Sequence, residues 1–296
     1  MKTMKKGMKD NIERKQPSIN EVIKHKGFPL FSFIELNINE ICNRKCPFCP
    51  RATPEIYPNQ NIHMDIKLAE NIAQQLKDLN FKGIVNISGT GEPLLTKHIP
   101  DIIKQFGDRG IHIEVVTNGD RLKRKDGKDL IKNLYASGLQ QFVVSMYDGP
   151  EQIDYFNNLF SSCGISTNLY SLRDRWYDES EDYGLLYTNR AGNIEYDQLS
   201  EISKEKLTKS KNFACYYTHY SMYIDWNGDA LLCCQDMYNR TLTFGNVKEK
   251  NIFDIWKDAK LMEFRKKLKE GDRSSSPCSN CNANGRIFGH NHSKSW

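Results

Sequence analysis

Short runs rich in β-branched and aromatic residues alternate with stretches of helical periodicity between residues 31 and 172. The runs expected to form strands are Phe33–Ile38, Ile84–Ser88, Ile111–Thr117, Gln141–Met146 and Ile165–Leu172. The stretches expected to form helices are Met64–Leu79, Ile99–Phe106, Lys128–Ser137 and Glu151–Phe160. Strand and helix repeated in this order predict parallel strands joined by right-handed helical crossovers.

The number of strand–helix units limits the kind of barrel that this region can form. Residues 185–188 give one further candidate strand, so the chain holds five or six such units. A closed TIM barrel needs eight strands. The fold class predicted is therefore α/β, with a partial, open TIM-like βα barrel.

The first strand has a polar side and an apolar side. Its apolar residues alternate with Glu35, Asn37 and Asn39. Successive side chains of a strand point to opposite faces, so we expect the polar set to face the barrel lumen and the apolar set to face the outer helices. Polar side chains at a strand end are also satisfied by nearby backbone groups in many proteins, which leaves a purely structural role open.

The pattern changes after Thr188. The segment Tyr220–Cys234 predicts a β-hairpin, because Asn227-Gly228 supplies the positive φ of a tight primed turn. Asn251–Glu270 is expected to be one helix, and Cys278–Trp296, rich in Ser, Asn and Gly, is expected to be loop. The predicted division is a basic N-terminal extension (1–30), the partial barrel (31–200), a small hairpin-and-helix domain (201–285) and a C-terminal tail (286–296).

Composition limits the location of the protein. Hydrophobic residues make up 39% of the 296 residues, and no apolar run approaches the ~20 residues that a membrane span needs. The N-terminus is basic but no apolar stretch follows it, so it predicts a solvated tail or a fraying helix rather than a signal peptide. We therefore expect a cytoplasmic protein without a membrane partner.

The net charge indicates which kinds of partner the protein is expected to bind. It is +5 and is spread along the chain, without the clustered basic and aromatic residues of a nucleic-acid binder. Nucleic acid is therefore not an expected partner. A mildly basic cleft would suit an anionic substrate, such as a phosphorylated or nucleotide-linked sugar, although scattered lysines more often form only solvated helix faces.

The nine cysteines carry the strongest chemical signal. Cysteines stay reduced in the cytosol, where close spacing indicates metal or redox chemistry rather than disulfides. Directly after the first strand, Cys42, Cys46 and Cys49 place three thiols within eight residues. Three thiolates can hold three corners of a cubane cluster and leave the fourth iron open, whereas a zinc site normally takes a fourth protein ligand. A zinc knuckle or three unrelated thiols are the alternatives.

The spacing C-x3-C-x2-C, with Phe48 just before the last cysteine, resembles the signature of the radical S-adenosylmethionine (SAM) family. The resemblance implies a [4Fe–4S] cluster on Cys42, Cys46 and Cys49 that binds SAM at its open iron. It also implies an external electron donor, which is a reductase, a flavodoxin or a ferredoxin.

Further motifs match the SAM-binding elements of that family. Residues 88–93, Ser-Gly-Thr-Gly-Glu-Pro, resemble the segment in which glycines let the backbone approach SAM while Glu92 binds its ammonium group. A plain turn with an acid is the alternative. The resemblance gives five further positions a role near SAM, and they are Gly89, Thr90, Gly91, Asn118 and Ser145, the last for the ribose hydroxyls. It assigns the SAM carboxylate to Arg173, or to the neighbouring Arg175.

The second group of cysteines resembles the ligands of the auxiliary-cluster domains called SPASM and of their shortened "twitch" form. The matching positions are Cys215, Cys233, Cys278 and Cys281, with Cys233 preferred over Cys234 by the family spacing. They imply a second [4Fe–4S] cluster. A four-cysteine structural zinc site is the alternative.

Cys234 is the cysteine left over. Adjacent residues of a strand face opposite sides, so if Cys233 faces the cluster then Cys234 faces the substrate cavity. A thiol there can return a hydrogen atom to a substrate radical, which would make Cys234 catalytic. The alternative is a buried cysteine that acts as a small hydrophobe.

The resemblance implies a function. A 5′-deoxyadenosyl radical would abstract a hydrogen atom from a small hydroxylated substrate, a sugar or an aminocyclitol. The expected enzyme is then a dehydrogenase if the auxiliary cluster takes the electron, or an epimerase if Cys234 returns a hydrogen atom. A peptide maturase is the alternative enzyme. An iron–sulfur electron carrier or a zinc-stabilised scaffold is the alternative outside enzymes.

Overall fold

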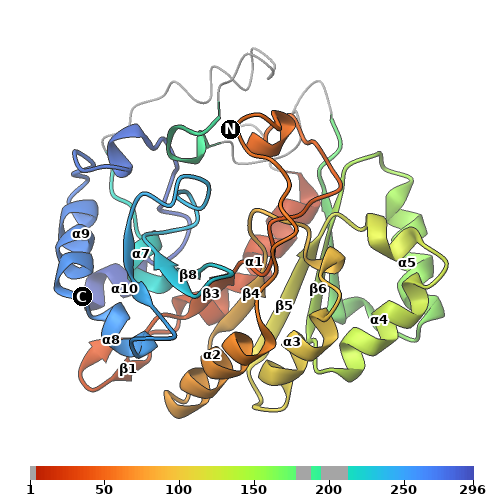
Figure 1. Ribbon diagram of the computed structural model, residues 1–296, viewed down its shortest axis with the longest axis horizontal. Coiled ribbons are helices and arrows are strands. Elements are labelled where there is room, and N and C mark those ends of the chain that lie inside the picture. The colour runs from red at the N-terminus through yellow and green to blue at the C-terminus, as the bar shows by residue number, and fades with distance from the viewer. Residues whose placement is uncertain (1–4, 178–187, 195–212) are drawn as a thin grey trace.

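A single eight-stranded sheet organises the protein. The computed structural model describes residues 5–177, 188–194 and 213–296, and the strand order of its main sheet is β10-β9-β8-β3-β4-β5-β6-β7. The barrel strands are β3 (Phe33–Leu36), β4 (Ile84–Ile87), β5 (His112–Thr117), β6 (Gln141–Met146) and β7 (Tyr170–Asp174). They pair in parallel, and the order ends at β7 and β10 without closing (Figure 1). The predicted open α/β barrel is therefore confirmed.

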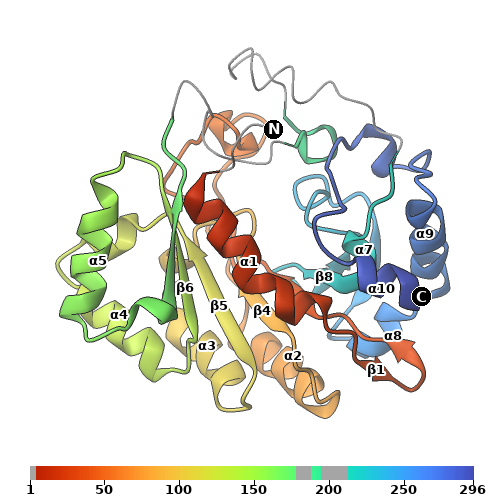
Figure 2. The same cartoon turned by 180° about the vertical axis from the view of Figure 1, so that it is seen from behind.

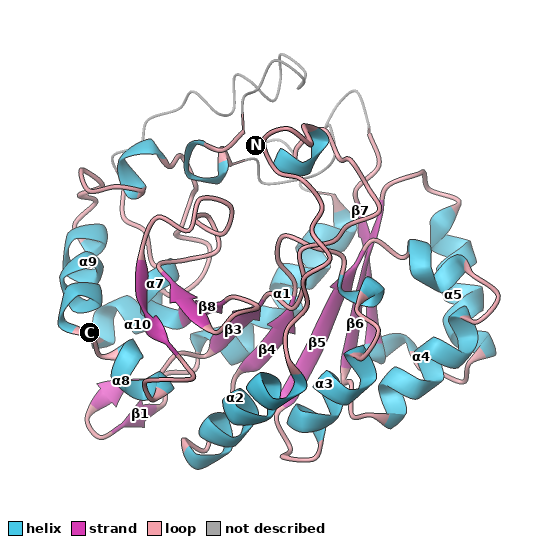
Figure 3. Ribbon diagram, in the orientation of Figure 1, coloured by secondary structure: helices cyan, strands magenta, loops and turns pink. Residues whose placement is uncertain are grey.

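Four helices cover the outer face of the barrel strands (Figure 3). They are α2 (Ile66–Asp78), α3 (Ile99–Gly107), α4 (Gly127–Ala136) and α5 (Gln152–Ser162). Their apolar faces pack on the sheet, whose strand β6 is buried over its whole length. Asp65 begins α2 by accepting a hydrogen bond from the backbone N–H of Lys67.

The last barrel strand differs from the prediction. Residues 165–172 were expected to be extended, but a 3-10 turn occupies Thr167–Leu169 and the strand runs from Tyr170 to Asp174. This shift places Arg173 inside β7, directly opposite Ser145 of β6. The candidate strand at residues 185–188 lies almost entirely outside the described residues.

The C-terminal hairpin continues the sheet of the barrel. Strand β8 (Ser221–Ile224) pairs in parallel with β3, and β9 (Asp229–Leu231) and β10 (Thr243–Asn246) follow antiparallel. The predicted two-residue primed turn is wrong, because of the two turn residues only Gly228 has a positive φ, at 95°. Asp225 accepts a hydrogen bond from Gly228 and donates one to Asp229, which closes a three-residue loop that ends on that glycine.

The segment predicted as one helix over residues 251–270 forms two. These are α8 (Ile252–Trp256) and α9 (Ala259–Lys269). Asn251 and Asp258 each accept a hydrogen bond from a backbone N–H two residues later, so each begins a helix of its own.

The C-terminal tail is not all loop as predicted. It ends in a helix, α10 (His290–Ser295), which lies beside α7 (Tyr217–Tyr220). His292 is fully buried there, and the indole N–H of Trp296 donates to the carbonyl of His219 at 3.1 Å. The tail therefore adds to the core, although its sequence is polar.

The N-terminal extension is also better ordered than a solvated tail. It forms α1 (Lys6–Asn20), which crosses the face of the sheet opposite to α2–α5 (Figure 2). The strands β1 (Lys24–His25) and β2 (Phe28–Pro29) then lead into β3. Lys15 donates to Asn86 at 3.1 Å and lies 3.4 Å from Glu114, so a lysine of α1 is buried against the barrel strands. In the described part of the chain, no helix is long and apolar enough to span a bilayer.

Candidate active site

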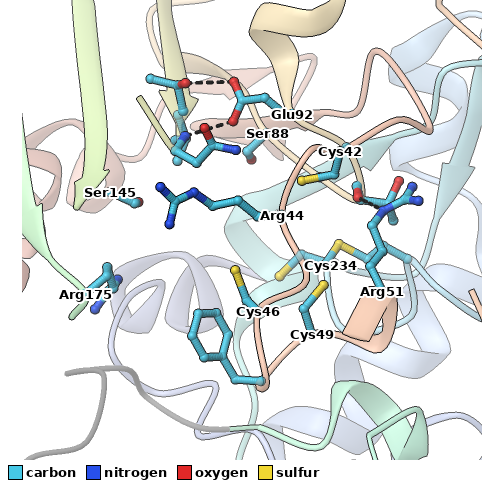
Figure 4. A pocket seen from close by; sticks show the side chains of 18 of the residues that line it. Cys42, Arg44, Cys46, Cys49, Arg51, Ser88, Glu92, Ser145, Arg175 and Cys234 are labelled. Carbon is cyan, nitrogen blue, oxygen red and sulfur yellow. Dashed lines mark hydrogen bonds between the residues drawn. The ribbon is translucent and has the colours of Figure 1, made fainter. Parts of the chain in front are cut away.

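A cavity of about 330 Å³ lies at the carboxyl ends of the barrel strands (Figure 4). This is the edge where parallel βα folds place their active sites. We call it the strand-end cavity. Cys42, Cys46 and Cys49, the loop cysteines, line it together with the ends of β4, β5, β6 and β7. The structure therefore brings the predicted cysteine loop and the predicted SAM-binding motifs to one place.

A buried arginine holds the loop that carries these thiols in place. Cys49 donates its backbone N–H to Cys46, and Ala52 donates in turn to Cys49. Arg51, two residues beyond the last thiol, forms a salt bridge of 2.9 Å with buried Glu40. The three thiols stay partly exposed. Their backbone is therefore fixed while the sulfur atoms face the cavity.

Two glycines let the backbone of residues 88–93 enter the cavity. Gly89 has a φ of 148°, and a side chain there would place its Cβ 2.4 Å from Asn37. At Gly91 a Cβ would lie 1.6 Å from Asn39. Neither position accepts another residue without displacing these asparagines. Two asparagines that follow β3 thus hold the glycine loop, through hydrogen bonds from Asn37 to Thr90 at 3.0 Å and from Asn39 to the Glu92 carbonyl at 2.8 Å.

Glu92 is a buried carboxyl group at the cavity wall, with 3% of its surface exposed. It accepts hydrogen bonds from the backbone of Asn118 at 2.8 Å, from Thr117 at 2.7 Å and from the backbone of Leu94 at 3.0 Å. Burial nevertheless raises the pKa of Glu92 to about 7, against these hydrogen bonds. A cationic group in the cavity, such as an ammonium, would stabilise the ionised form.

Ser145 and Arg173 face each other across β6 and β7. Arg173 donates to the Ser145 hydroxyl at 2.8 Å, while its buried Nε has no hydrogen-bond partner among the described residues. Burial, together with the nearby charge of Arg175, lowers the pKa of Arg173 to about 9. This position therefore favours an anion such as a carboxylate. Arg175 lines the same cavity, so both arginines remain candidates for that role.

The second group of cysteines surrounds a separate pocket. Its members, which we call the auxiliary cysteines, are Cys215, Cys233, Cys278 and Cys281. Burial raises the pKa of the Cys215 thiol to about 11 and that of Cys278 to about 12. The Cys281 sulfur accepts a backbone N–H from Ala283 at 3.4 Å, the kind of contact that a thiolate ligand receives.

Adjacent cysteines divide between the two sites. Cys233 lines the auxiliary pocket, whereas Cys234 lines the strand-end cavity. Cys234 is hydrogen-bonded to the carboxyl group of Glu35, and burial raises the pKa of both groups. The two side chains face different sites as expected, although the cysteines lie in the turn after β9 (Asp229–Leu231) and not in a strand.

A third space, the side cavity, adjoins the strand-end cavity and has a volume of about 640 Å³. The residues that line both form their common wall, and they are Lys15, Glu35, Arg173, Arg190 and Cys234. A small molecule in the side cavity therefore reaches the same residues as one in the strand-end cavity. The side cavity is also lined by α1 and by the C-terminal segment.

Sequence reasoning missed three residues of this site. Lys15 belongs to a segment expected to be solvated, and Arg190 lies in a stretch without a motif. Arg190 and Ala191 both have a positive φ, at 45° and 56°, which is uncommon for residues other than glycine. Tyr238 places its hydroxyl 3.3 Å from the sulfur of Cys49. No sequence motif marks Tyr238, and only its contact with Cys49 in the folded protein identifies it as part of the site.

The thiols of both groups fit iron–sulfur clusters. In the described ranges, no three Cys, His, Asp or Glu side chains lie close enough to bind one metal ion, as a zinc site requires. In a cubane each thiolate binds its own iron, so the thiols surround a volume rather than a point. Three thiols beside an open cavity suit a cluster with one free iron, and four thiols around one pocket, three of them buried, suit a fully ligated one.

Models of two protein families match the chain. The model described as the radical SAM superfamily covers residues 36–160, which include the loop cysteines. The model described as an iron–sulfur cluster-binding domain, SPASM, covers residues 215–282, which include the auxiliary cysteines.

Curated proteins give similar matches. The S-adenosyl-L-methionine-dependent 2-deoxy-scyllo-inosamine dehydrogenase of Niallia circulans is 30% identical over 257 residues, which cover 86% of this chain and 93% of that protein. A GTP 3′,8-cyclase of Helicobacter pylori is 30% identical over 121 residues, which cover 40% of this chain and 35% of that enzyme.

Solved structures match as well. BtrN in complex with AdoMet and 2-DOIA superposes with a TM-score of 0.69 at 26% identity, covering 89% of this chain and 98% of BtrN. Streptococcus suis SuiB bound to its precursor peptide SuiA gives a TM-score of 0.50 at 17% identity, covering 85% of this chain and 70% of SuiB, which is a likeness of fold alone.

Proposed function

The chain belongs to the radical SAM superfamily, and on that premise we propose that it is a dehydrogenase that oxidises a hydroxyl group of a small polyhydroxylated compound. The family match confirms the resemblance drawn from the loop cysteines. It makes the protein an enzyme that uses SAM and [4Fe–4S] clusters, one for SAM and one auxiliary. The electron-carrier and scaffold alternatives are thereby set aside.

We assign the site residues from the placement described above. The loop cysteines would hold the cluster that binds SAM, and the auxiliary cysteines would hold the second cluster. Glu92 would bind the SAM ammonium, because no cation among the described residues pairs with its buried carboxyl group. Arg173 would bind the SAM carboxylate, and Ser145 a ribose hydroxyl. Gly89, Thr90 and Gly91 would bring the backbone to SAM, and Asn118 would help to close that wall.

The proposed oxidation requires one further group from the protein, a proton acceptor. When bound, the clusters and SAM supply the 5′-deoxyadenosyl radical that removes a hydrogen atom, and an acceptor for the electron that remains. The hydroxyl group must then lose a proton for a carbonyl to form. Glu35 lies on the common wall of the two cavities, and we assign it as the proton acceptor. One hydrogen atom, one proton and one electron leave in total, which balances the oxidation.

The observation that carries the dehydrogenase proposal is the position of Cys233 and Cys234. These consecutive residues face the auxiliary pocket and the strand-end cavity, respectively. A substrate beside Cys234 is therefore one residue away from a ligand of the auxiliary cluster. This short path supports electron transfer from the substrate to that cluster.

The substrate class follows from the relatives. The Niallia circulans relative is named for 2-deoxy-scyllo-inosamine, an aminocyclitol. We infer a cyclic polyol, a sugar or an aminocyclitol, for this chain too. We also propose a cytoplasmic location, where thiols stay reduced, and a reductase, flavodoxin or ferredoxin as the electron donor.

Anaerobic incubation tests the proposal. Reconstituted protein, dithionite and SAM are mixed with candidate polyols, and 5′-deoxyadenosine and the product mass are measured. The expected product is lighter than the substrate by two hydrogens, with one 5′-deoxyadenosine formed per product. Formation of 5′-deoxyadenosine without any oxidised product from a broad panel of polyols would contradict it.

An epimerase is the second candidate, and the hydrogen bond between Cys234 and Glu35 favours it. It places a thiol in the cavity as a hydrogen-atom donor. The product would then keep the substrate mass in ordinary water and gain one deuterium in D2O, because thiol protons exchange with solvent. Cys234→Ala would still cleave SAM but give no inverted product. An oxidised product that survives this substitution would exclude the epimerase.

A further inference from the structure

The side cavity is larger than a bare aminocyclitol requires. At about 640 Å³ it is roughly twice the volume of the strand-end cavity, and it lies in the size range of pockets that bind drug-sized ligands. Aromatic rings line it, and they are Phe33, Phe213, Tyr217, Tyr220 and Phe288. Amide side chains, including Asn11, Gln235 and Asn284, lie between them.

Its wall carries more positive than negative charge. The basic residues are Lys15, Arg173, Arg190 and Arg286, and the acidic residue is Glu35. Lys15 is balanced by Glu114, which also binds Arg14, so it contributes little to the excess. Arg173 is assigned above to the SAM carboxylate. The two basic residues of this wall that have no role assigned so far are Arg190 and Arg286, of which Arg286 donates from its Nε to Asn284 at 3.5 Å.

Neither of these two arginines has a carboxylate partner within the described part of the chain. The charge of Glu35, which is hydrogen-bonded to Cys234, acts on Arg190 without forming a salt bridge with it. The backbone of Arg190 has a positive φ. Proteins retain such a strained conformation where the surrounding structure holds the residue in a fixed position. Arg286 is exposed, and its guanidinium stacks 4.7 Å from the ring of Phe213.

We propose that the substrate is a phosphate-bearing sugar, whose phosphate binds Arg190 and Arg286 in the side cavity while its reacting carbon lies at the Glu35–Cys234 wall. This inference rests on the proposed function. Guanidinium groups suit phosphate because their planar fork donates two parallel hydrogen bonds. The same charges disfavour an aminocyclitol, which carries an ammonium group. Either a sugar monophosphate or a nucleoside diphosphate sugar satisfies this chemistry, and the aromatic rings would stack with the base of the latter.

Equilibrium binding to the reconstituted, SAM-saturated protein tests the proposal, with glucose 1-phosphate, UDP-glucose, glucose and 2-deoxy-scyllo-inosamine as probes. We expect the two phosphate-bearing probes to bind at least about tenfold more tightly than the other two. Tighter binding of UDP-glucose than of glucose 1-phosphate would identify a nucleotide sugar, and equal binding a sugar phosphate. If neither binds more tightly than glucose, the proposal is overturned.

Variants separate the side cavity from the rest of the enzyme. Arg286→Gln should weaken binding of the phosphate-bearing probes about tenfold and leave iron content and SAM affinity unchanged. Arg190→Gln should have the same effect on the probes, with iron content as a check of folding. Arg124→Gln, an exposed arginine before α4, is the matched control and should change nothing. Undiminished binding of phosphate probes to both cavity variants would refute the assignment.

The two claims fail in different ways. If a neutral polyol is oxidised with formation of 5′-deoxyadenosine while no phosphate-bearing probe binds, the dehydrogenase stands and the phosphate inference falls. If phosphate-bearing probes bind through Arg190 and Arg286 but no polyol, with or without a phosphate group, is oxidised, the dehydrogenase falls and the anion site stands.

Discussion

The loop cysteines and the auxiliary cysteines have the same ligand chemistry but different surroundings. The loop cysteines are three, lie on one short segment, remain partly exposed and face a cavity of about 330 Å³. The auxiliary cysteines are four, come from three separate segments, and all but Cys233 are buried. On the assignment proposed above, a cluster in the first site would keep an iron for SAM, whereas a cluster in the second would have its ligands complete. The number and exposure of the thiols would then distinguish a reactive site from one that only exchanges electrons.

The sequence context enforces this difference. A contiguous segment such as Cys42–Cys49 can wrap around only part of a cluster, and the glycines of residues 88–93 keep the opposite side clear for a ligand. In the auxiliary site, a Cβ on Gly285 would lie 2.2 Å from the sulfur of Cys215, so the chain closes tightly around the thiols. Arg273 then ties the segments together through the carbonyls of Phe213, Cys281 and Ala283.

Removal of the loop cysteines should have the largest effect. The variant Cys42→Ala/Cys46→Ala/Cys49→Ala is expected to lose SAM cleavage completely and to hold about four instead of about eight iron atoms per chain. Cys163→Ala, which removes a partly exposed thiol at the end of α5, is the control and should keep both. Iron analysis and 5′-deoxyadenosine formation are the measurements. Full iron content in the triple variant would contradict the ligand assignment.

Removal of auxiliary cysteines should separate radical formation from product formation. Cys278→Ala/Cys281→Ala is expected to lose the second cluster, and with it the oxidised product, while SAM cleavage continues at the loop cysteines. The thermal midpoint should also fall, because the cluster links segments distant in the chain. Product assays and thermal unfolding measure these effects. Undiminished oxidation in this variant would show that the electron leaves by another route.

Loss of the Glu92 carboxylate should weaken SAM binding by about 10- to 100-fold, the effect of losing one charged hydrogen bond. Glu92→Gln is the conservative variant. Burial raises the pKa of Glu92 to about 7, so the ionised form that attracts the SAM ammonium is lost as the pH falls below that value. SAM, whose own amino group titrates near ~7.8, should therefore bind the wild type more tightly at pH 7.5 than at pH 6. The same pH dependence in Glu92→Gln would assign it to another group.

Tyr238 offers the smallest and most local change. Its hydroxyl lies 3.3 Å from the Cys49 sulfur, and hydrogen bonds to ligand sulfurs raise the reduction potential of a cluster. Tyr238→Phe should lower the potential of the cluster at the loop cysteines by roughly tens of millivolts and leave that of the auxiliary cluster unchanged. A redox titration followed by EPR measures both. A shift confined to the auxiliary cluster would exclude this contact.

The sequence predicted best what depends on local pattern. Strand β6 begins and ends where its apolar run does, and the cysteine and glycine segments lie where their spacing indicated. The predictions are wrong where contacts between residues distant in the sequence determine the structure. The polar segments of α1 and α10 are ordered because Lys15 is bound by Glu114 and because His292 is buried, and neither contact shows in local periodicity.

Among the residues of the candidate site, too, those marked by a local motif could be predicted and those placed by distant contacts could not. Cysteine spacing marks Cys233 and Cys234, but the turn that follows β9, rather than strand alternation, places them on opposite sides. Arg190 and Tyr238 belong to no motif, since each contributes through groups distant in the sequence. Glu35 was expected in the lumen, but its hydrogen bond to Cys234 required the hairpin to pair beside β3.

We propose that only the cluster at the loop cysteines presents an open iron to SAM. EPR spectra of the reduced protein with and without SAM, recorded for the wild type and for the variant in which the loop cysteines are alanine, test this proposal. SAM should change the wild-type spectrum and leave that of the variant, which retains the auxiliary cluster, unaltered. A variant spectrum that still changes on addition of SAM would show that SAM binds elsewhere.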